Sequence, residues 1–208
     1  MKKLIIGMLV LVLAAYAVDK FLLKKKHADT DAGTPTLRLD SKNSEAFNNS
    51  FEKLLKGYFS LKEAIADYDT TRADKAALEL SGYADSLDTK AITGDSTGHI
   101  RNTAQSFASG ISAGAKGLPA KADLTEKKRS FQLISESLYN LVRTVRYDRQ
   151  VLYHQHCPMA FNDTEEAWWI SNNRKIDNPY MGRKHPKYHA AMTNCGDITD
   201  SLDYAKKH

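Results

Sequence analysis

The feature that most constrains this chain is a repeat of apolar residues that runs from position 44 to position 146. Apolar side chains recur three or four residues apart, the spacing that places them on one face of an α-helix. The repeat falls into four runs, so it predicts four amphipathic helices, each with one face to bury. The apolar positions are Phe47, Phe51, Leu54, Leu55, Tyr58, Leu61 and Ile65; Ala73, Ala76, Ala77, Leu80, Tyr83, Ala84 and Leu87; Ile100, Ala104, Phe107, Ile111 and Gly114; and Phe131, Ile134, Leu138, Leu141, Val142 and Val145.

Local signals mark where these helices begin and end. Asp69 or Thr70 can cap the second helix, and residues 93–98, rich in Gly and Thr, separate the second from the third. The third is the weakest of the four, because glycine in a helix interior costs about 1 kcal/mol relative to alanine. Asp123 and Glu126 form a capping box at the start of the fourth.

The fourth helix has a basic solvent side in this interpretation. The side chains expected on it are Lys127, Lys128, Arg129, Arg143 and Arg146. Four amphipathic helices with short connections favour an antiparallel up-and-down bundle. The predicted fold class is therefore all-α, a four-helix bundle followed by a loop-rich C-terminal segment that is rich in Cys, Met and His.

The N-terminus predicts export. Lys2 and Lys3 precede an uncharged apolar run, and Ala15-Tyr16-Ala17 resembles a signal-peptidase site. Residues 1–26 are thus a signal peptide or a membrane anchor, since the apolar stretch to Leu23 can span a bilayer of roughly 20 residues. The protein is expected to be periplasmic, either tethered to the inner membrane through this segment or secreted after cleavage. Residues 27–43 follow as a tether, residues 44–198 as the folded part and residues 199–208 as a tail.

The charge distribution argues against nucleic acid as a partner. The net charge is +5, but residues 1–26 hold six lysines against one aspartate, which leaves 24 basic and 24 acidic residues in the rest of the chain. A neutral folded part lacks the electrostatic attraction that dominates nucleic-acid affinity.

Soft metal donors are concentrated in residues 147–198. Every Met and Cys beyond the leader lies between Cys157 and Cys195, and four of the seven histidines lie between His154 and His189. Thiolate and thioether sulfur prefer Cu(I), and imidazole serves copper and zinc. The segment therefore predicts a metal site, with copper as Cu(I) favoured and zinc possible.

The candidate ligands fall into two groups. Cys157 and Met159 can converge in one turn, and Met192 and Cys195 are three residues apart. Zinc could instead take the two cysteines with two histidines. The primary candidates are Cys157, Met159, Met192 and Cys195, and the secondary candidates are His154, His156, Met181, His185 and His189.

Two alternatives use the same residues differently. In an exported protein, Cys157 and Cys195 could form a disulfide if their Cα atoms lie within about 7 Å, and the methionines could be packing. A dithiol oxidoreductase is disfavoured, because redox cysteines normally lie close in sequence with one thiol activated. Since the helical faces hold no paired buried carboxylates or nucleophile with its base, the chain is not expected to be an enzyme.

Several of these residues also carry a resemblance to a known family. The chain resembles the domain-of-unknown-function family numbered 3347, over roughly residues 47–198, on Phe131 with Ser135, Cys157-Pro158-Met159-Ala160-Phe161, Trp169, Ile176, Asn178-Pro179-Tyr180, Met192 and Cys195-Gly196. The family occurs alone behind an export signal or attached to CusB-type adaptors of heavy-metal efflux systems. The chain departs from the family pattern by an insertion at residues 183–191, which brings His185 and His189.

The resemblance implies metal handling. Together with the soft donors it predicts an exported copper- or heavy-metal-binding accessory protein that buffers metal or passes it to an efflux adaptor. The alternative is an envelope interaction module with a structural Cys157–Cys195 disulfide and no metal.

Overall fold

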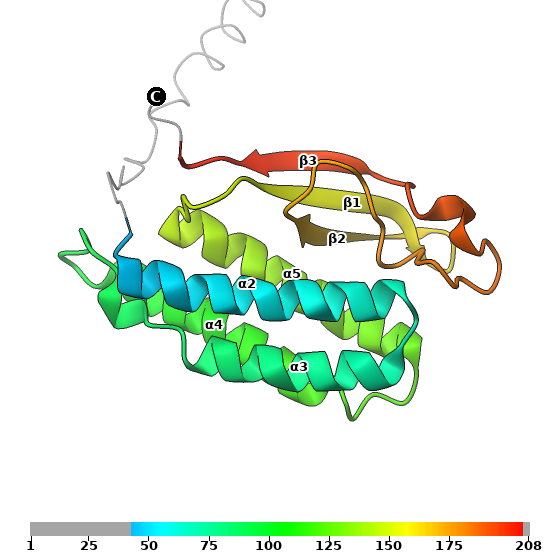
Figure 1. Ribbon diagram of the computed structural model, residues 1–208, viewed down its shortest axis with the longest axis horizontal. Helices are drawn as coiled ribbons and strands as arrows, with labels where there is room; N and C mark the ends of the chain where they lie inside the picture. The colour runs from blue at the N-terminus through cyan, green and yellow to red at the C-terminus, as the bar shows by residue number, and fades with distance from the viewer. Residues whose placement is uncertain (1–42, 206–208) are drawn as a thin grey trace, which may run out of the picture. The chain divides into compact units, whose positions relative to one another are not determined.

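The computed structural model describes residues 43–205, in which a layer of four helices packs against a small antiparallel sheet (Figure 1). The helices are α2 (Glu45–Ala66), α3 (Thr70–Asp85), α4 (His99–Gly117) and α5 (Leu124–Val145). The strands are β1 (Leu152–Phe161), β2 (Glu165–Ser171) and β3 (Asp197–Leu202), and short 3-10 helices occur at Thr89–Ala91 (η1) and Ala190–Met192 (η2).

The helical part follows the sequence prediction closely. Each helix packs on the next along the chain, α2 on α3, α3 on α4 and α4 on α5. All the apolar positions predicted for α2 and α5 are at most 1% exposed. Ser44 caps α2, Asp69 caps α3 and Asp123 caps α5, each by accepting a hydrogen bond from the backbone N–H three residues on. The helix α4 passes through Gly110 and Gly114 without a break.

The predicted all-α fold class is nevertheless wrong, because residues 152–202 contain a three-stranded sheet in the order β2-β1-β3. Both pairings are antiparallel, with Gln155 opposite Trp169 on one side and His156 opposite Asp197 on the other. The protein is a mixed helix-and-sheet fold. The segment interpreted as loop-rich supplies β1 and β2, and the strand β3 crosses the boundary that was placed between the folded part and the tail.

The polar sequence of β1 explains the error. Its buried residues include Gln155, whose Nε2 donates to the Asn173 carbonyl at 2.9 Å, while His154 and His156 stay partly exposed. No clear apolar alternation marks the strand. The hairpin to β2 turns at Asn162 and Asp163, which both have positive φ, and such residues favour this conformation. The Asn-Asp pair is therefore the sequence signal that could have indicated this hairpin.

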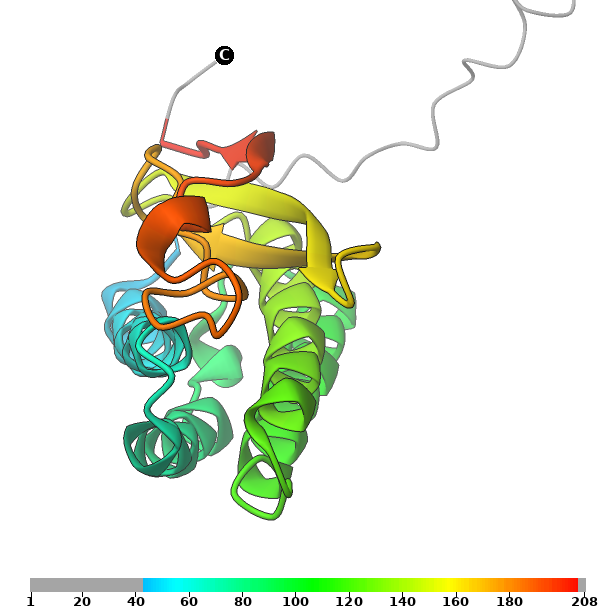
Figure 2. The same cartoon turned by 90° about the vertical axis from the view of Figure 1, so that its right-hand side faces the viewer.

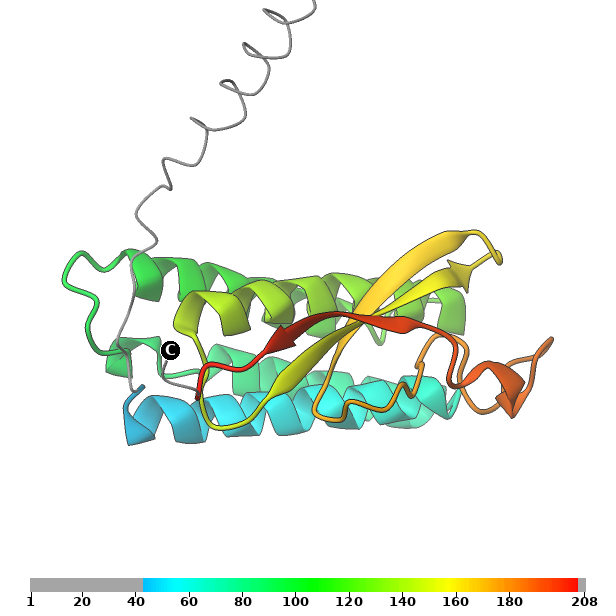
Figure 3. The ribbon, with the colours of Figure 1, turned by 90° about the horizontal axis from the view of Figure 1, so that it is seen from above.

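The sheet lies along one side of the helices, and β2 contacts α5 (Figures 1 and 2). Seen from above, the strands run obliquely to the helix axes (Figure 3). Tyr58 of α2 joins the layers, since its hydroxyl accepts from the Ile170 N–H of β2 at 3.0 Å and lies 2.7 Å from Ser135 Oγ of α5. One hydrophobic core therefore includes side chains of both layers.

Two basic residues expected in solvent are buried at this junction. Lys127 and Lys128 are 4% and 6% exposed, because the chain after α4 and the loop after β2 cover the start of α5. Lys127 Nζ contacts Asp74 and the Leu118 carbonyl. The apolar pattern of a helix cannot predict which of its polar residues are buried by segments distant in sequence.

The membrane prediction concerns residues 1–26, which lie outside the described residues, as does most of the tether. Among residues 43–205 no helix is long and apolar enough to span a bilayer.

Candidate functional site at the paired cysteines

The two cysteines meet between β1 and the chain that leads into β3. Cys157 lies within β1 and is fully buried, and Cys195 lies between η2 and β3 and is partly exposed. The side chain of Cys157 lies next to that of Cys195 and interacts with it. Residues separated by 38 positions in the chain thus place two sulfur atoms side by side, as both the metal and the disulfide hypotheses required.

Backbone geometry holds this approach. The antiparallel pairing of β1 with β3 ends at His156 and Asp197, directly beside the two cysteines. Gly196 has φ +132°, and a Cβ atom there would lie 2.2 Å from the His156 carbonyl oxygen. Only glycine allows the two backbones to come this close. The glycine that follows Cys195 therefore has a structural reason in this chain.

Residues 172–196 form a loop that we call the strap, and Asn178 in this loop contacts both cysteines. It is fully buried, its side chain is hydrogen-bonded to Cys157, and its Nδ2 donates to the Cys195 carbonyl at 2.7 Å. Its Oδ1 accepts from the Tyr180 and Met181 N–H groups at 2.9 and 3.1 Å. Asn178-Pro179-Tyr180 begin a turn, in which the Gly182 N–H donates to the Asn178 carbonyl at 2.9 Å, and this turn organises the site.

The electrostatic surroundings do not activate the buried thiol. Burial raises the pKa of Cys157, although hydrogen bonds from the Asn178 side chain and the Met159 N–H act in the opposite direction. The Lys128 ammonium interacts with Cys157 electrostatically. The net effect keeps the Cys157 sulfur protonated over a wider pH range than a free thiol.

The methionines are placed around the cysteines with different roles. Met159 and Met192 are partly buried and pack against the core, and Met192 accepts from the Cys195 N–H at 3.0 Å through its carbonyl. Met181 is 1% exposed and belongs to the core. Sulfur ligation by Met159 and Met192 stays a prediction.

The secondary histidine candidates are engaged elsewhere. His154 stacks on Tyr139 with ring centroids 3.9 Å apart, and burial lowers its pKa to about 4. The ring nitrogens of His156 lie 2.9 Å from Asp197 and 3.2 Å from Glu166.

The insertion histidines pair through the backbone, where the His189 N–H donates to the His185 carbonyl at 2.8 Å. The Nδ1 of His185 accepts N–H groups of its own loop, from Lys187 and Tyr188.

The metal prediction is corrected for a centre that includes the histidines, while the Cu(I) site at Cys157, Met159, Met192 and Cys195 stays a prediction. Within residues 43–205 no group of three or more His, Cys, Asp or Glu side chains could hold a metal ion. The physical reason is that each histidine ring of the sheet is committed to a carboxylate, a hydroxyl or an aromatic neighbour.

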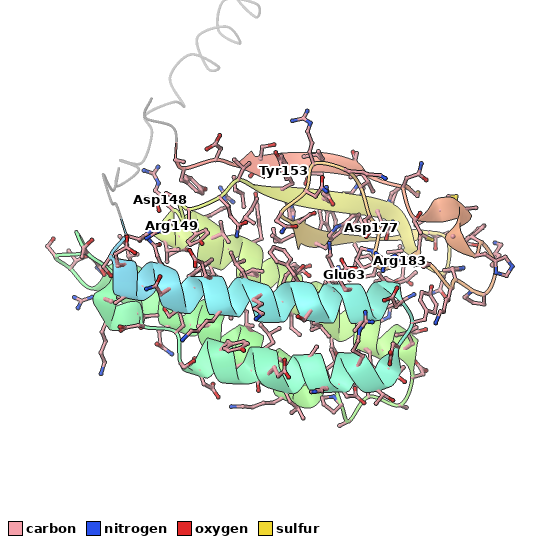
Figure 4. The ribbon with its side chains drawn as sticks, viewed as in Figure 1. Glu63, Asp148, Arg149, Tyr153, Asp177 and Arg183 are labelled. Atoms are coloured by element: carbon pink, nitrogen blue, oxygen red, sulfur yellow. The ribbon has the colours of Figure 1, made fainter. Side chains whose placement is uncertain are left out.

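Sequence reasoning missed the residue that fastens the strap to the helices. Arg183 donates to Asp67 at 2.7 Å, to Glu63 at 2.9 Å and to Asp177 at 2.6 Å, and Figure 4 shows it close to Glu63 and Asp177 beside the end of α2. Its backbone N–H donates to the Ala66 carbonyl at 2.7 Å. Arg183 lies in the insertion, where only the histidines were considered.

A separate surface groove of about 710 Å³ lies away from the cysteines. Side chains of both charges line it, from α2 (Glu52, Lys56, Glu63) and from α3 (Arg72, Lys75, Glu79). Its lining includes none of the predicted ligands.

Fold and site together define a class of protein: a small helix-and-sheet domain in which a strap brings a second cysteine onto a buried one. Residues 54–150 match the sequence model of a family described as "Protein of unknown function (DUF3347)". This confirms the resemblance to that family. The match ends before β1, so it does not include Cys157, Cys195 or the rest of the C-terminal motif. No curated protein and no solved structure matches the chain.

Proposed function

We propose that this protein is an exported, non-enzymatic interaction domain whose sheet and strap are joined by a Cys157–Cys195 disulfide. The leader-like residues 1–26 support export, and exported proteins fold in compartments where neighbouring thiols are oxidised. The partner is another envelope protein. Heavy-metal efflux adaptors, which the family resemblance implies, are the first to test.

The observation that carries this proposal is the direct contact between the two cysteine side chains. Their backbones are held by the β1–β3 pairing, by Gly196 and by Asn178. A disulfide here would join β1 to the end of the strap. It would close a loop of 38 residues, which stabilises a protein by on the order of 3–4 kcal/mol in the chain-entropy account.

The chemistry of the thiols favours a structural role over a catalytic one. Reactive cysteines normally have a lowered pKa in an electropositive, accessible place. Cys157 is buried and its pKa is raised. Such a sulfur suits a structural cross-link better than a catalytic nucleophile.

The experiment is a thiol count on protein exported through its own leader and purified without reductant. After denaturation and alkylation, intact mass should show no modified cysteine without prior reduction and two modified cysteines after it. The Cys157→Ser and Cys195→Ser variants should each lower the free energy of unfolding by about 3 kcal/mol. The double variant is the matched control, and reductant should leave its stability unchanged.

Two free thiols in the exported protein would contradict the proposal. A Cu(I) competition titration of that reduced protein then tests the rival prediction. Uptake that is lost in Cys157→Ser and weakened in Met159→Leu would point to copper handling in place of a structural disulfide.

A further inference from the structure

The two cysteine residues of the site differ in access to solvent. Cys157 is fully buried within β1. Cys195 is partly exposed and lies between Asn194 and Gly196, which are both exposed. An external molecule can therefore reach one sulfur of the pair and not the other.

We infer that Cys195 is the exchange cysteine of this protein, the atom at which external disulfides and thiols react, and that Cys157 is the resolving cysteine. The inference rests on the proposed Cys157–Cys195 disulfide and names how that bond is made and broken. The class of co-reactant is a small disulfide or thiol, for which oxidised and reduced glutathione serve as probes.

Oxidation proceeds in two exchange steps. The Cys195 thiolate attacks one sulfur of an external disulfide, the bond between its two sulfurs breaks, and one thiolate leaves. Cys157 then attacks Cys195 Sγ and expels the second thiolate, and the two departed thiolates take up the two protons that the cysteines lose. The protein loses two electrons and two protons, and the external disulfide becomes two thiols.

Reduction follows the reverse path, and the structure favours the same polarity. An incoming thiolate attacks Cys195 Sγ, and Cys157 leaves as a thiolate. The side chain of Asn178 and the Met159 N–H are already hydrogen-bonded to Cys157, and Lys128 supplies a positive charge within electrostatic reach. These groups offset part of the cost that burial imposes on the Cys157 thiolate.

The pair is also held together while the exchange takes place. Asn178 fixes the Cys195 carbonyl, and Gly196 packs against the His156 carbonyl. After Cys195 has formed a mixed disulfide, Cys157 therefore remains next to the sulfur that it must attack. Resolution should be fast, and the mixed disulfide should accumulate only when Cys157 is missing.

The test compares Cys157→Ser and Cys195→Ser with oxidised glutathione, using intact mass to follow adduct formation. In the folded state Cys157→Ser should gain one glutathione at Cys195, at least about tenfold faster than Cys195→Ser gains one at Cys157. In denaturant the two rates should become similar, because the fold no longer shields Cys157. Circular dichroism verifies that both variants are folded.

A second measurement uses the wild type, so that it does not depend on the variants. Reduced protein is exposed briefly to oxidised glutathione, quenched with acid and mapped by peptide mass. Any mixed disulfide should be on Cys195. Equal reactivity of the two variants when folded, or an adduct on Cys157, would overturn the inference.

Failure here is distinct from failure of the proposed function. Free thiols in the exported protein would reject the proposed cross-link, while selective reaction at Cys195 would still show which sulfur meets an external disulfide. A disulfide in the exported protein with equal access to both sulfurs would leave the structural cross-link intact and reject the exchange role of Cys195.

Discussion

At the scale of single residues, Lys128 is the most unusual group in the described part of the chain. Its Nζ donates to the Tyr180 carbonyl and to the Tyr68 hydroxyl, each at 2.6 Å, and lies 3.9 Å from the centre of the Tyr68 ring. Burial lowers the pKa of Lys128 to about 8. The amine thus holds the strap by hydrogen bonds while its charge is poorly solvated.

This predicts a pH dependence of stability with a definite sign. Below pH 8 the amine is protonated in both states, so its contribution is constant. Between about pH 8 and 10.4 the unfolded chain binds more protons than the folded one, so stability rises with pH. The unfolding free energy of the oxidised wild type minus that of Lys128→Met should increase over this range, by roughly 1–3 kcal/mol.

Urea unfolding at several pH values provides the measurement, and the oxidised protein is used so that the cysteines do not titrate. The exposed Lys121, changed to Met, is the control, and its difference from the wild type should not follow this curve. A flat difference for Lys128→Met would show that the buried amine does not titrate below its usual range.

At the scale of elements, the strap depends on one tight crossing over the end of α2. Gly182 has φ +46°, and a Cβ atom there would lie 2.2 Å from the Tyr68 ring and 2.7 Å from the Ala66 carbonyl oxygen. The next residue, Arg183, makes the ion pairs with Glu63, Asp67 and Asp177. The crossing brings Arg183 to these carboxylates.

Gly182→Ala should therefore destabilise the protein by roughly 1–3 kcal/mol, through positive φ and steric overlap. Gly82→Ala is the matched control, because Gly82 lies within α3 with no neighbour within 4 Å of a Cβ atom. It should stabilise by about 0.5–1 kcal/mol. Thermal unfolding, followed by circular dichroism, distinguishes the two variants. Equal effects of both changes on stability would show that the crossing does not require glycine at position 182.

At the scale of the whole described fold, Tyr58 makes the helical layer and the sheet depend on each other. The Ser135 hydroxyl donates to the Phe131 carbonyl at 2.8 Å, so the Tyr58 hydroxyl donates to Ser135 and accepts from Ile170. One buried phenol thus serves α2, α5 and β2. Two layers that share a core and such a contact should unfold together.

Tyr58→Phe should cost about 1–3 kcal/mol, because it leaves the buried Ile170 N–H without its acceptor. Urea unfolding is read from helical circular dichroism and from tryptophan fluorescence, for which the buried Trp169 reports on the sheet. Both signals should shift by the same amount in one transition. Tyr83→Phe, on the partly exposed side of α3, is the control, and a shift of the fluorescence alone would show that the sheet unfolds separately.

The amino-acid sequence by itself determined the helices of this protein. Their apolar spacing, the caps at Ser44, Asp69 and Asp123, and the burial of the α2 and α5 faces are local properties, since residues three and four apart lie together on any helix. The presence of two chemically important cysteines was equally visible. Their spacing in the chain could not establish whether they meet.

Only the tertiary structure decided the C-terminal half. The strand β1 has polar residues at buried positions, such as Gln155, whose side chain is hydrogen-bonded to a carbonyl of the strap 18 residues away. For this reason no local apolar pattern predicted the strand. The histidines looked like ligands because composition ignores their neighbours, and in the fold His154 meets Tyr139 and His156 meets two carboxylates. The contact between Cys157 and Cys195 arises from the β1–β3 pairing and from Gly196, because long-range strand pairing brings together atoms whose separation along the chain carries no information about their distance in space.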